Sequence, residues 1–225
     1  MINKKIESAV IFALIIILLV GGFYAFRKFK KPANTSPNSP QTSSQTPTPQ
    51  PSPSAATSQI SASGLDFPIA EFKQRITKKP FGIYITRENS PIQPERFTGY
   101  HTGDDVEYQD VTADVPVYAV LDGRVVLSET ASGYGGVFMI EIQLDGAAHT
   151  ILYGHIRPSS LPKVGQNVSK GEQIGLLGTG YSAETDGERR HLHFAVLPDN
   201  RIDIKGYVQN KSELSGWIDP LSLYN

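Results

Sequence analysis

The chain has 225 residues, which is enough for one ordinary domain with additional terminal segments. Its 21 lysines and arginines nearly balance 22 aspartates and glutamates, and the formal net charge of -1 predicts no general attraction to nucleic acid. The absence of cysteine excludes disulfides, thiolate zinc sites and a cysteine nucleophile, so five histidines and the acidic residues are the remaining strong metal ligands.

A transmembrane helix is the first predicted element. Residues 9–26 are apolar and uncharged, and as a helix they would be about 27 Å long at ~1.5 Å per residue, close to the thickness of a hydrocarbon core. Basic residues at 27–31 follow the run where a signal peptide would have a small-residue cleavage site, so we expect an uncleaved anchor over residues 1–31. The basic residues before the helix are Lys4 and Lys5, whereas four basic residues follow it at 27–31. The positive-inside rule alone would therefore leave the C-terminal body in the cytoplasm.

A disordered linker is predicted over residues 32–64. This stretch is rich in Pro, Ser and Thr and carries no charge, so it cannot bury enough apolar surface to fold. In an extended, proline-rich conformation of ~3 Å per residue it would hold a domain as much as about 100 Å from the membrane. An unstructured tail with partner-binding motifs is the alternative, although no PxxP element stands out from the repeated T-P and S-P steps.

Residues 65–225 are predicted to form one compact antiparallel β domain of the all-β class. Short apolar runs alternate with Gly, Pro and Asp, and helix is expected at most in short connections near 69–74. Two pairs of runs flank Asp-Gly turns, which are hairpin signals: 115–120 and 124–127 around Asp122-Gly123, and 137–144 and 148–155 around Asp145-Gly146.

Two histidines share one face of a predicted strand at residues 190–196 (RHLHFAV). His191 and His193 alternate with apolar residues that point to the opposite face and can enter a core. The two imidazoles are about 6 to 7 Å apart at ~3.3 Å per residue. Both therefore reach one small site, one as a metal ligand and the other beside it or as an acid and base.

A second motif, residues 101–105 (HTGDD), supplies another imidazole and a carboxylate. Gly103 allows the backbone to bend so that His101 and one aspartate converge. Asp104 and Asp105 face opposite ways in an extended chain, so only one of them reaches the metal. With one histidine of 191–193 this gives two imidazoles and a carboxylate, which leave the fourth position of Zn²⁺ to water, as in catalytic zinc sites.

A third histidine, His155, ends the second predicted hairpin. An imidazole beside the metal can take or return a proton during attack on a carbonyl. Each motif has a simpler interpretation, as a hydrogen-bonded structural histidine or an Asp-Asp turn, but three in one short domain favour a metal site. His149 lies about 20 Å from His155 at ~3.3 Å per residue and is interpreted as a surface or packing residue. Arg189 and Arg190 are interpreted as a solvated turn or as contacts for a substrate carboxylate.

These motifs, taken in order, resemble the lysostaphin-type or LytM-like zinc metallopeptidases, which cut the peptide part of bacterial peptidoglycan. The resemblance covers roughly residues 76–221; each motif is weak alone, whereas the ordered series is strong. The matching segments are Ile76-Thr77, Phe81-Gly82, 101–105, 115–119 with 122–126, 133–135, 153–155, 164–168, 191–194 and 219–221.

The resemblance implies a compact β-sheet domain with a groove floored by one zinc ion. The implied ligands are His101, Asp105 and His193, which decides between the two aspartates. His155 and His191 are implied to activate water and to stabilise the tetrahedral intermediate.

Three departures from the family pattern bear on which bond is cut. Asp104 replaces a usually apolar residue, Ala195 replaces a usual glutamate, and residues 181–190 replace a short Gly-Pro-containing turn. All five implied site residues are kept.

The sequence therefore predicts a membrane-anchored zinc endopeptidase that hydrolyses stem or cross-bridge peptide bonds of peptidoglycan by metal-activated water. We expect a single-pass protein of the cell membrane whose catalytic domain is extracytoplasmic, because the substrate is there, against the charge bias around the anchor. The expected partners are peptidoglycan peptide and the membrane, with no nucleic acid; cell-division proteins or other wall hydrolases remain open.

The alternative function is a noncatalytic LytM-like module that binds the cell wall or activates another wall hydrolase. Such degenerate members typically lack the five-residue site, which this chain keeps. A structural zinc domain is disfavoured, because structural sites close all four positions and only three ligands are implied.

Overall fold

The computed structural model describes residues 64–224. The predicted anchor at 1–31 and, apart from Gly64, the predicted linker at 32–64 lie outside the described residues. Within 64–224, no helix has the length and apolar character needed to cross a membrane.

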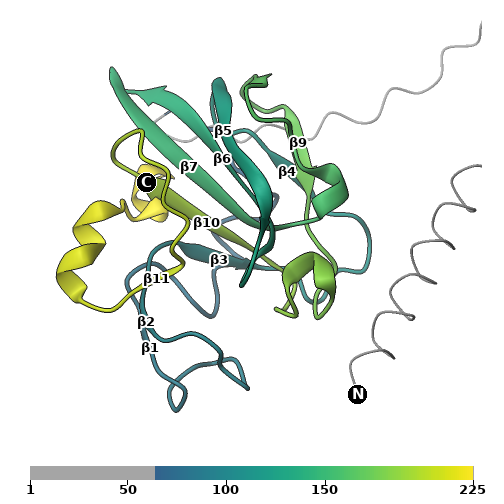
Figure 1. The fold of residues 1–225 in the computed structure, drawn as a ribbon, viewed down its shortest axis with the longest axis vertical. Helices are drawn as coiled ribbons and strands as arrows, with labels where there is room; N and C mark the ends of the chain where they lie inside the picture. The colour runs from purple at the N-terminus through teal and green to yellow at the C-terminus, as the bar shows by residue number, and fades with distance from the viewer. Residues whose placement is uncertain (1–63, 225) are drawn as a thin grey trace, which may run out of the picture. The chain divides into compact units, whose positions relative to one another are not determined.

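Six strands form the main sheet, and each neighbouring pair in it is antiparallel. In spatial order the strands are β3 (Asp104–Glu107), β10 (His191–Leu197), β7 (Ala147–Ile156), β6 (Gly135–Leu144) and β5 (Gly123–Ala131), which Figure 1 labels, and then β8 (Asn167–Val168). The strand that carries the histidine pair, β10, therefore lies inside the sheet, between β3 and β7.

Two smaller antiparallel sheets complete the strand structure. One consists of β1 (Tyr84–Ile85), β2 (Gly99–His101) and β11 (Tyr207–Val208), and the other of β4 (Pro116–Tyr118) and β9 (Gln173–Leu176). The helices of the described residues are short 3-10 helices: η1 (Pro158–Ser160), η2 (Ala183–Thr185), η3 (Lys211–Gly216) and η4 (Pro220–Tyr224). The domain is thus mostly β-sheet, as the sequence predicts.

The two Asp-Gly signals have different outcomes. Asp145 and Gly146 both have positive φ, 52° and 79°, and connect β6 to β7 in the tight hairpin that the sequence predicts. The hairpin predicted around Asp122-Gly123 is wrong, because β4 pairs with β9 whereas β5 pairs with β6 and β8. Asp122 instead accepts a hydrogen bond from the Lys170 backbone, so this turn passes the chain from one sheet to another.

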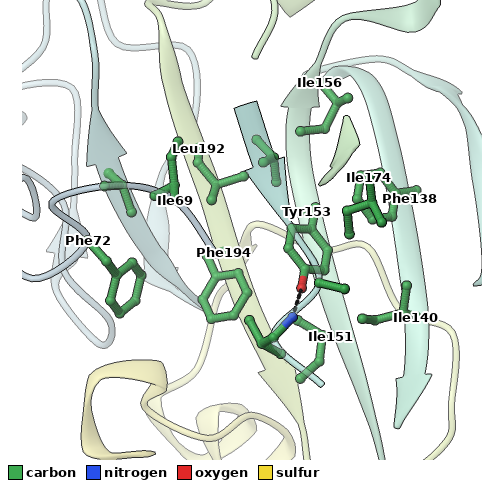
Figure 2. Packing of buried hydrophobic residues seen from close by; sticks show 14 of the residues in the cluster. Ile69, Phe72, Phe138, Ile140, Ile151, Tyr153, Ile156, Ile174, Leu192 and Phe194 are labelled. Carbon is green, nitrogen blue, oxygen red and sulfur yellow. Dashed lines mark hydrogen bonds between the residues drawn. The ribbon is translucent and has the colours of Figure 1, made fainter. Parts of the chain in front are cut away.

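Alternation along β10 separates an apolar core from the other face of the sheet. Leu192, Phe194 and Val196 are at most 1% exposed and belong to the larger hydrophobic cluster. The Phe194 ring lies beside those of Phe72 and Tyr153 (Figure 2). It meets both rings edge-on, with ring centres 5.5 Å from Phe72 and 5.4 Å from Tyr153. Burying a side chain of this size stabilises the fold by about 1.5–3 kcal/mol, so this packing fixes the position of β10.

A smaller cluster lies on the opposite face and includes Ala195, Leu197, Leu152 and Met139. His191 and His193 share this face with Ala195, because residues two apart in a strand point the same way. The same face of β10 therefore carries apolar residues at its C-terminal end and two imidazoles at its N-terminal end.

Candidate metal centre

Strand register brings three of the predicted site residues together. His193 on β10 pairs with Asp105 on β3 on one side and with Gly154, which precedes His155, on the other. His101 ends β2 in the smaller sheet, and only three residues separate it from Asp105. The site therefore forms where the two sheets meet.

Gly103 allows this approach because it has no side chain. A Cβ atom at this position would lie 2.4 Å from the Phe194 carbonyl oxygen, so any other residue would push β3 away from β10. The sequence predicts that Gly103 serves to bend the backbone, whereas in the structure glycine is required by close contact with the backbone of β10.

Three donor atoms converge in a nearly equilateral triangle. His101 Nε2 lies 3.0 Å from His193 Nδ1 and 3.2 Å from Asp105 Oδ1. His193 Nδ1 and Asp105 Oδ1 are 3.1 Å apart. Ligand atoms around a tetrahedral zinc with bonds of ~2.0–2.1 Å are ~3.3 Å apart, so the triangle has the size that one ion requires. The three side chains are at most 3% exposed, and they form a group that could hold a metal ion.

The hydrogen bonds of the donor groups also fit a metal. His101 Nδ1 lies 3.3 Å from the Pro80 carbonyl oxygen, which can only accept, so the proton is on Nδ1 and the Nε2 lone pair faces the triangle. Burial opposes ionisation of Asp105, but the charges around it, including the guanidinium of Arg189, outweigh burial and hold the pKa of the carboxyl well below its usual range.

His155 and His191 form a second pair of imidazoles beside the triangle. Their ring centres are 4.1 Å apart, and His191 Nε2 lies 3.4 Å from Asp105 Oδ2. Burial lowers the pKa of His155 to about 3 and lowers the pKa of His191 well below its usual value. Both rings are therefore neutral near pH 7, and each has a nitrogen that can accept a proton.

The two imidazoles differ in how they are held. His191 Nδ1 donates to the Arg189 carbonyl at 2.9 Å, which leaves Nε2 as its acceptor nitrogen. His155 has a positive φ of 62°, and its buried Nδ1 has no hydrogen-bond partner among residues 64–224. His155 therefore keeps an unsatisfied nitrogen at the site.

Alternation also separates the two adjacent aspartates. Asp104 points to the opposite face from Asp105, where its Oδ1 accepts from the Phe81 backbone at 2.8 Å. Burial raises the pKa of Asp104 to about 6. Asp104 is thus outside the donor triangle, as expected for neighbouring strand residues.

The prediction for His149 agrees with the structure, whereas the prediction for Arg189 and Arg190 does not. His149 is partly exposed, and its Nδ1 lies 3.1 Å from the Ala147 carbonyl, in agreement with a surface role. The solvated turn predicted for Arg189 and Arg190 is wrong, because they are 1% and 8% exposed. Arg189 donates to Asp105 Oδ2 at 2.6 Å and to Glu107 Oε1 at 2.7 Å, and Arg190 donates to the Val111 carbonyl.

A cavity of about 500 Å³ lies over the site. All five predicted site residues line it, together with the aromatic residues Phe97, Tyr134 and Tyr207 and the charged residues Arg96, Glu188 and Lys205. The cavity lies where the family resemblance implies a groove, and its mixed wall suits a ligand with both polar and apolar groups.

Tyr134 is a site residue that pattern reasoning did not assign. Its ring lies between His155 and His193, at 5.3 and 5.6 Å between ring centres, over Gly154, where a Cβ would lie 2.6 Å from the ring. Its buried hydroxyl has no hydrogen-bond partner within the described part of the chain. The signal in the sequence that could have identified Tyr134 is Gly133-Tyr134-Gly135, in which two glycines flank an aromatic residue.

The long segment at 181–190 forms one wall of the cavity. Asp186 Oδ2 accepts from the Gly133 backbone at 2.7 Å and from Arg96 at 3.0 Å, and Arg96 also donates to Glu188 at 3.1 Å. The segment therefore contacts two other loops beside the cavity. The five site residues still line the cavity.

A buried ion pair supports the part of the cavity wall that includes Lys79 and Tyr207. Lys79 Nζ donates to Glu95 Oε2 at 2.5 Å and to the Tyr207 hydroxyl at 3.1 Å, and both charged side chains are 2% exposed. The Tyr207 ring lies 5.1 Å from that of His101. The pair thus orders an aromatic residue that packs against a donor of the triangle.

Comparison with known proteins gives a family match. Residues 99–204 match the model of Peptidase family M23. No curated protein matches the chain.

Several solved structures are similar to this chain. LytU is 26% identical over 65% of this chain and 81% of its own, with a TM-score of 0.42. A zinc-containing peptidase from Vibrio cholerae is 21% identical over 66% of this chain and 47% of its own, with a TM-score of 0.37. A chain of the SpoIIIAH and SpoIIQ complex is 22% identical over 70% of this chain and 98% of its own, with a TM-score of 0.46.

Proposed function

We propose, on the premise that residues 99–204 belong to peptidase family M23, that this chain is a zinc endopeptidase of peptidoglycan. The observation that carries the proposal is the triangle of His101 Nε2, Asp105 Oδ1 and His193 Nδ1, with edges of 3.0–3.2 Å. These residues would hold one zinc ion and leave a position open. When bound, the ion supplies Lewis-acid chemistry: it lowers the pKa of a water to about 7 and polarises a peptide carbonyl.

The neutral imidazoles of His155 and His191 move the proton. As the water oxygen bonds to the peptide carbon, one imidazole takes the water proton, and it returns a proton to the leaving amine when the C–N bond breaks. His191 Nε2 is suited to this because Nδ1 is occupied by the Arg189 carbonyl. His155 Nδ1, buried and unpartnered within 64–224, is suited to stabilise the substrate oxygen once protonated or to share the proton.

The proposed substrate is peptide of the stem or cross-bridge, with the domain on the extracytoplasmic side of the cell membrane. Residues 1–31 would anchor the chain, and residues 32–64 would let the domain reach the wall. A membrane-impermeant protease added to intact cells tests the location. Cleavage of the domain is expected; protection in intact cells, with cleavage after lysis, would contradict it.

Mass spectrometry of soluble products tests the activity. The full-length chain is incubated with purified peptidoglycan of several wall types, with added zinc and with a chelator as the control. New peptide termini that disappear with the chelator are expected, and they identify the bond. No product from folded, zinc-loaded protein on any wall type would instead favour the noncatalytic module that binds the wall or activates another hydrolase.

A further inference from the structure

Arg189 is a fully buried cation next to the donor triangle. It lies two residues before β10, the strand that carries His191 and His193, and it is 1% exposed. An isolated charge in such a place would cost several kcal/mol, so its partners must account for its presence. Those partners are two carboxylates on β3, Asp105 and Glu107.

The guanidinium makes four close contacts with these carboxylates. Nη2 donates to Asp105 Oδ2 at 2.6 Å and to Glu107 Oε1 at 2.7 Å, while Nε donates to Glu107 Oε1 and Oε2 at 2.9 and 3.0 Å. Lys78 Nζ lies 3.6 Å from Glu107 Oε2, and Arg75 Nη1 donates to the Glu107 carbonyl at 3.0 Å. Glu107 thus fixes the guanidinium of Arg189, and Nη2 of that guanidinium reaches Asp105.

The two oxygens of Asp105 consequently face different partners. Oδ2 accepts from Arg189, whereas Oδ1 lies 3.1 Å from His193 Nδ1 and 3.2 Å from His101 Nε2. A carboxylate that is free to rotate would offer either oxygen, or both, to an ion. A hydrogen bond to one oxygen from a fixed donor leaves the other in the triangle.

We propose that Arg189, fixed by Glu107, is a positioning residue that holds Asp105 as a metal ligand through Oδ1 alone. The inference rests on the metal site of the proposed function and concerns how this chain prepares that site. Arginine suits the task because its planar fork spans two carboxylates at once, which a lysine ammonium cannot do with the same geometry. Glu107 lies opposite His191 in the strand register, and its bonds to Arg189 also keep this second carboxylate away from the ion.

Zinc affinity of the full-length double variant Glu107→Met/Arg189→Met tests the proposal. The double substitution removes one positive and one negative charge, so the net charge around the site is unchanged and only the positioning contact is lost. Replacing a buried ion pair by apolar residues of similar volume is often neutral for stability, which favours a folded variant. Competition with a chromophoric chelator should show zinc affinity about 10–100-fold weaker than in the unmodified chain.

A matched control and a conservative variant complete the experiment. Asp114→Asn/Arg157→Met removes a more exposed Asp–Arg pair, 2.6 Å apart, neither member of which lines the cavity, and it should leave zinc affinity unchanged. Arg189→Lys keeps the charge but not the fork, so we expect an affinity reduced by about tenfold; this variant decides the matter if the double variant does not fold.

The outcomes separate this inference from the proposed function. If the folded double variant, or Arg189→Lys, binds zinc as tightly as the unmodified chain, Arg189 does not position Asp105. If the unmodified chain itself binds no zinc, the proposed function fails first. Because the measurement is zinc affinity, it does not depend on whether the chosen peptidoglycan is the right substrate.

Discussion

The two faces of β10 are equally buried but are stabilised in different ways. Leu192, Phe194 and Val196 pack in the apolar core, whereas His191 and His193 face Asp105 and other polar groups, and each of these β10 residues is at most 3% exposed. Contacts on the apolar face are many and nondirectional. Contacts on the polar face are few and directional, so each group there depends on a particular partner.

This difference teaches where function and stability can be changed independently. A change on the apolar face should alter the free energy of unfolding and leave the donor atoms in place. A change on the polar face should alter metal binding or proton transfer with a smaller effect on folding of the metal-free chain. The following predictions test that division, from the largest expected effect to the smallest.

Removing a donor of the triangle should have the largest effect. His193→Ala leaves two donor atoms, so zinc content and release of peptide products should both fall to background. Elemental analysis and mass spectrometry measure the two quantities. His149→Ala, on the same sheet but partly exposed, is the control and should retain both; a His193→Ala variant that kept zinc and activity would contradict the site.

Removing an imidazole of the second pair should affect the reaction but not the metal. His155→Ala and His191→Ala should each reduce the rate of product formation by about 10²–10⁴-fold, as expected for loss of general acid or base catalysis. Zinc content should remain one ion per chain. Loss of zinc in either variant would show instead that this histidine is a ligand.

A change on the apolar face should have the opposite pattern. Phe194→Ala removes a ring that contacts Phe72 and Tyr153, and it should lower the free energy of unfolding by about 3–5 kcal/mol. Urea denaturation measures this loss. The zinc affinity of the folded variant, measured at low temperature, should be unchanged; a large loss of affinity would break the separation of the two faces.

Asp104 is the exception on the core side of the sheet, and it makes stability depend on pH. Burial raises its pKa to about 6, so between pH ~4 and ~6 the folded chain binds more protons than the unfolded chain and stability falls as pH rises. Asp104→Asn keeps an acceptor for the Phe81 N–H without ionising. The variant should be more stable by about 2–3 kcal/mol at pH 7 and nearly unchanged at pH 4.

Urea denaturation of the metal-free chain and the variant at the two pH values measures this difference. A gain of equal size at both pH values would mean that ionisation of Asp104 is not its cause.

Local patterns predicted much of the fold, and the ordered motifs pointed to the five residues that line the cavity. Alternation at 190–196 predicted the two faces of β10, and Asp145-Gly146 predicted the hairpin because its turn requires two residues with positive φ. Alternation likewise placed Asp104 and Asp105 on opposite faces. These features depend only on neighbours in the sequence.

Strand pairing and burial that depend on distant segments could not be predicted from local patterns. The pairing of β4 with β9 joins residues far apart in the chain, so the Asp122-Gly123 turn looked like a hairpin. Arg189 was misassigned because it is buried only once β10 pairs with β3 and brings Glu107 and Asp105 to it. A charged residue in a polar stretch has no local sign of burial, since its partners lie more than 80 residues away.

Anomalous diffraction at the zinc edge, from crystals of the zinc-loaded chain, is the most direct test of the central claim. One peak is expected, about 2.0–2.2 Å from His101 Nε2, Asp105 Oδ1 and His193 Nδ1, with Asp105 Oδ2 still bonded to Arg189. A peak elsewhere, or one bound by Glu107 or by His155 in place of these donors, would contradict the claim that the polar face of β10 builds a single three-ligand zinc site.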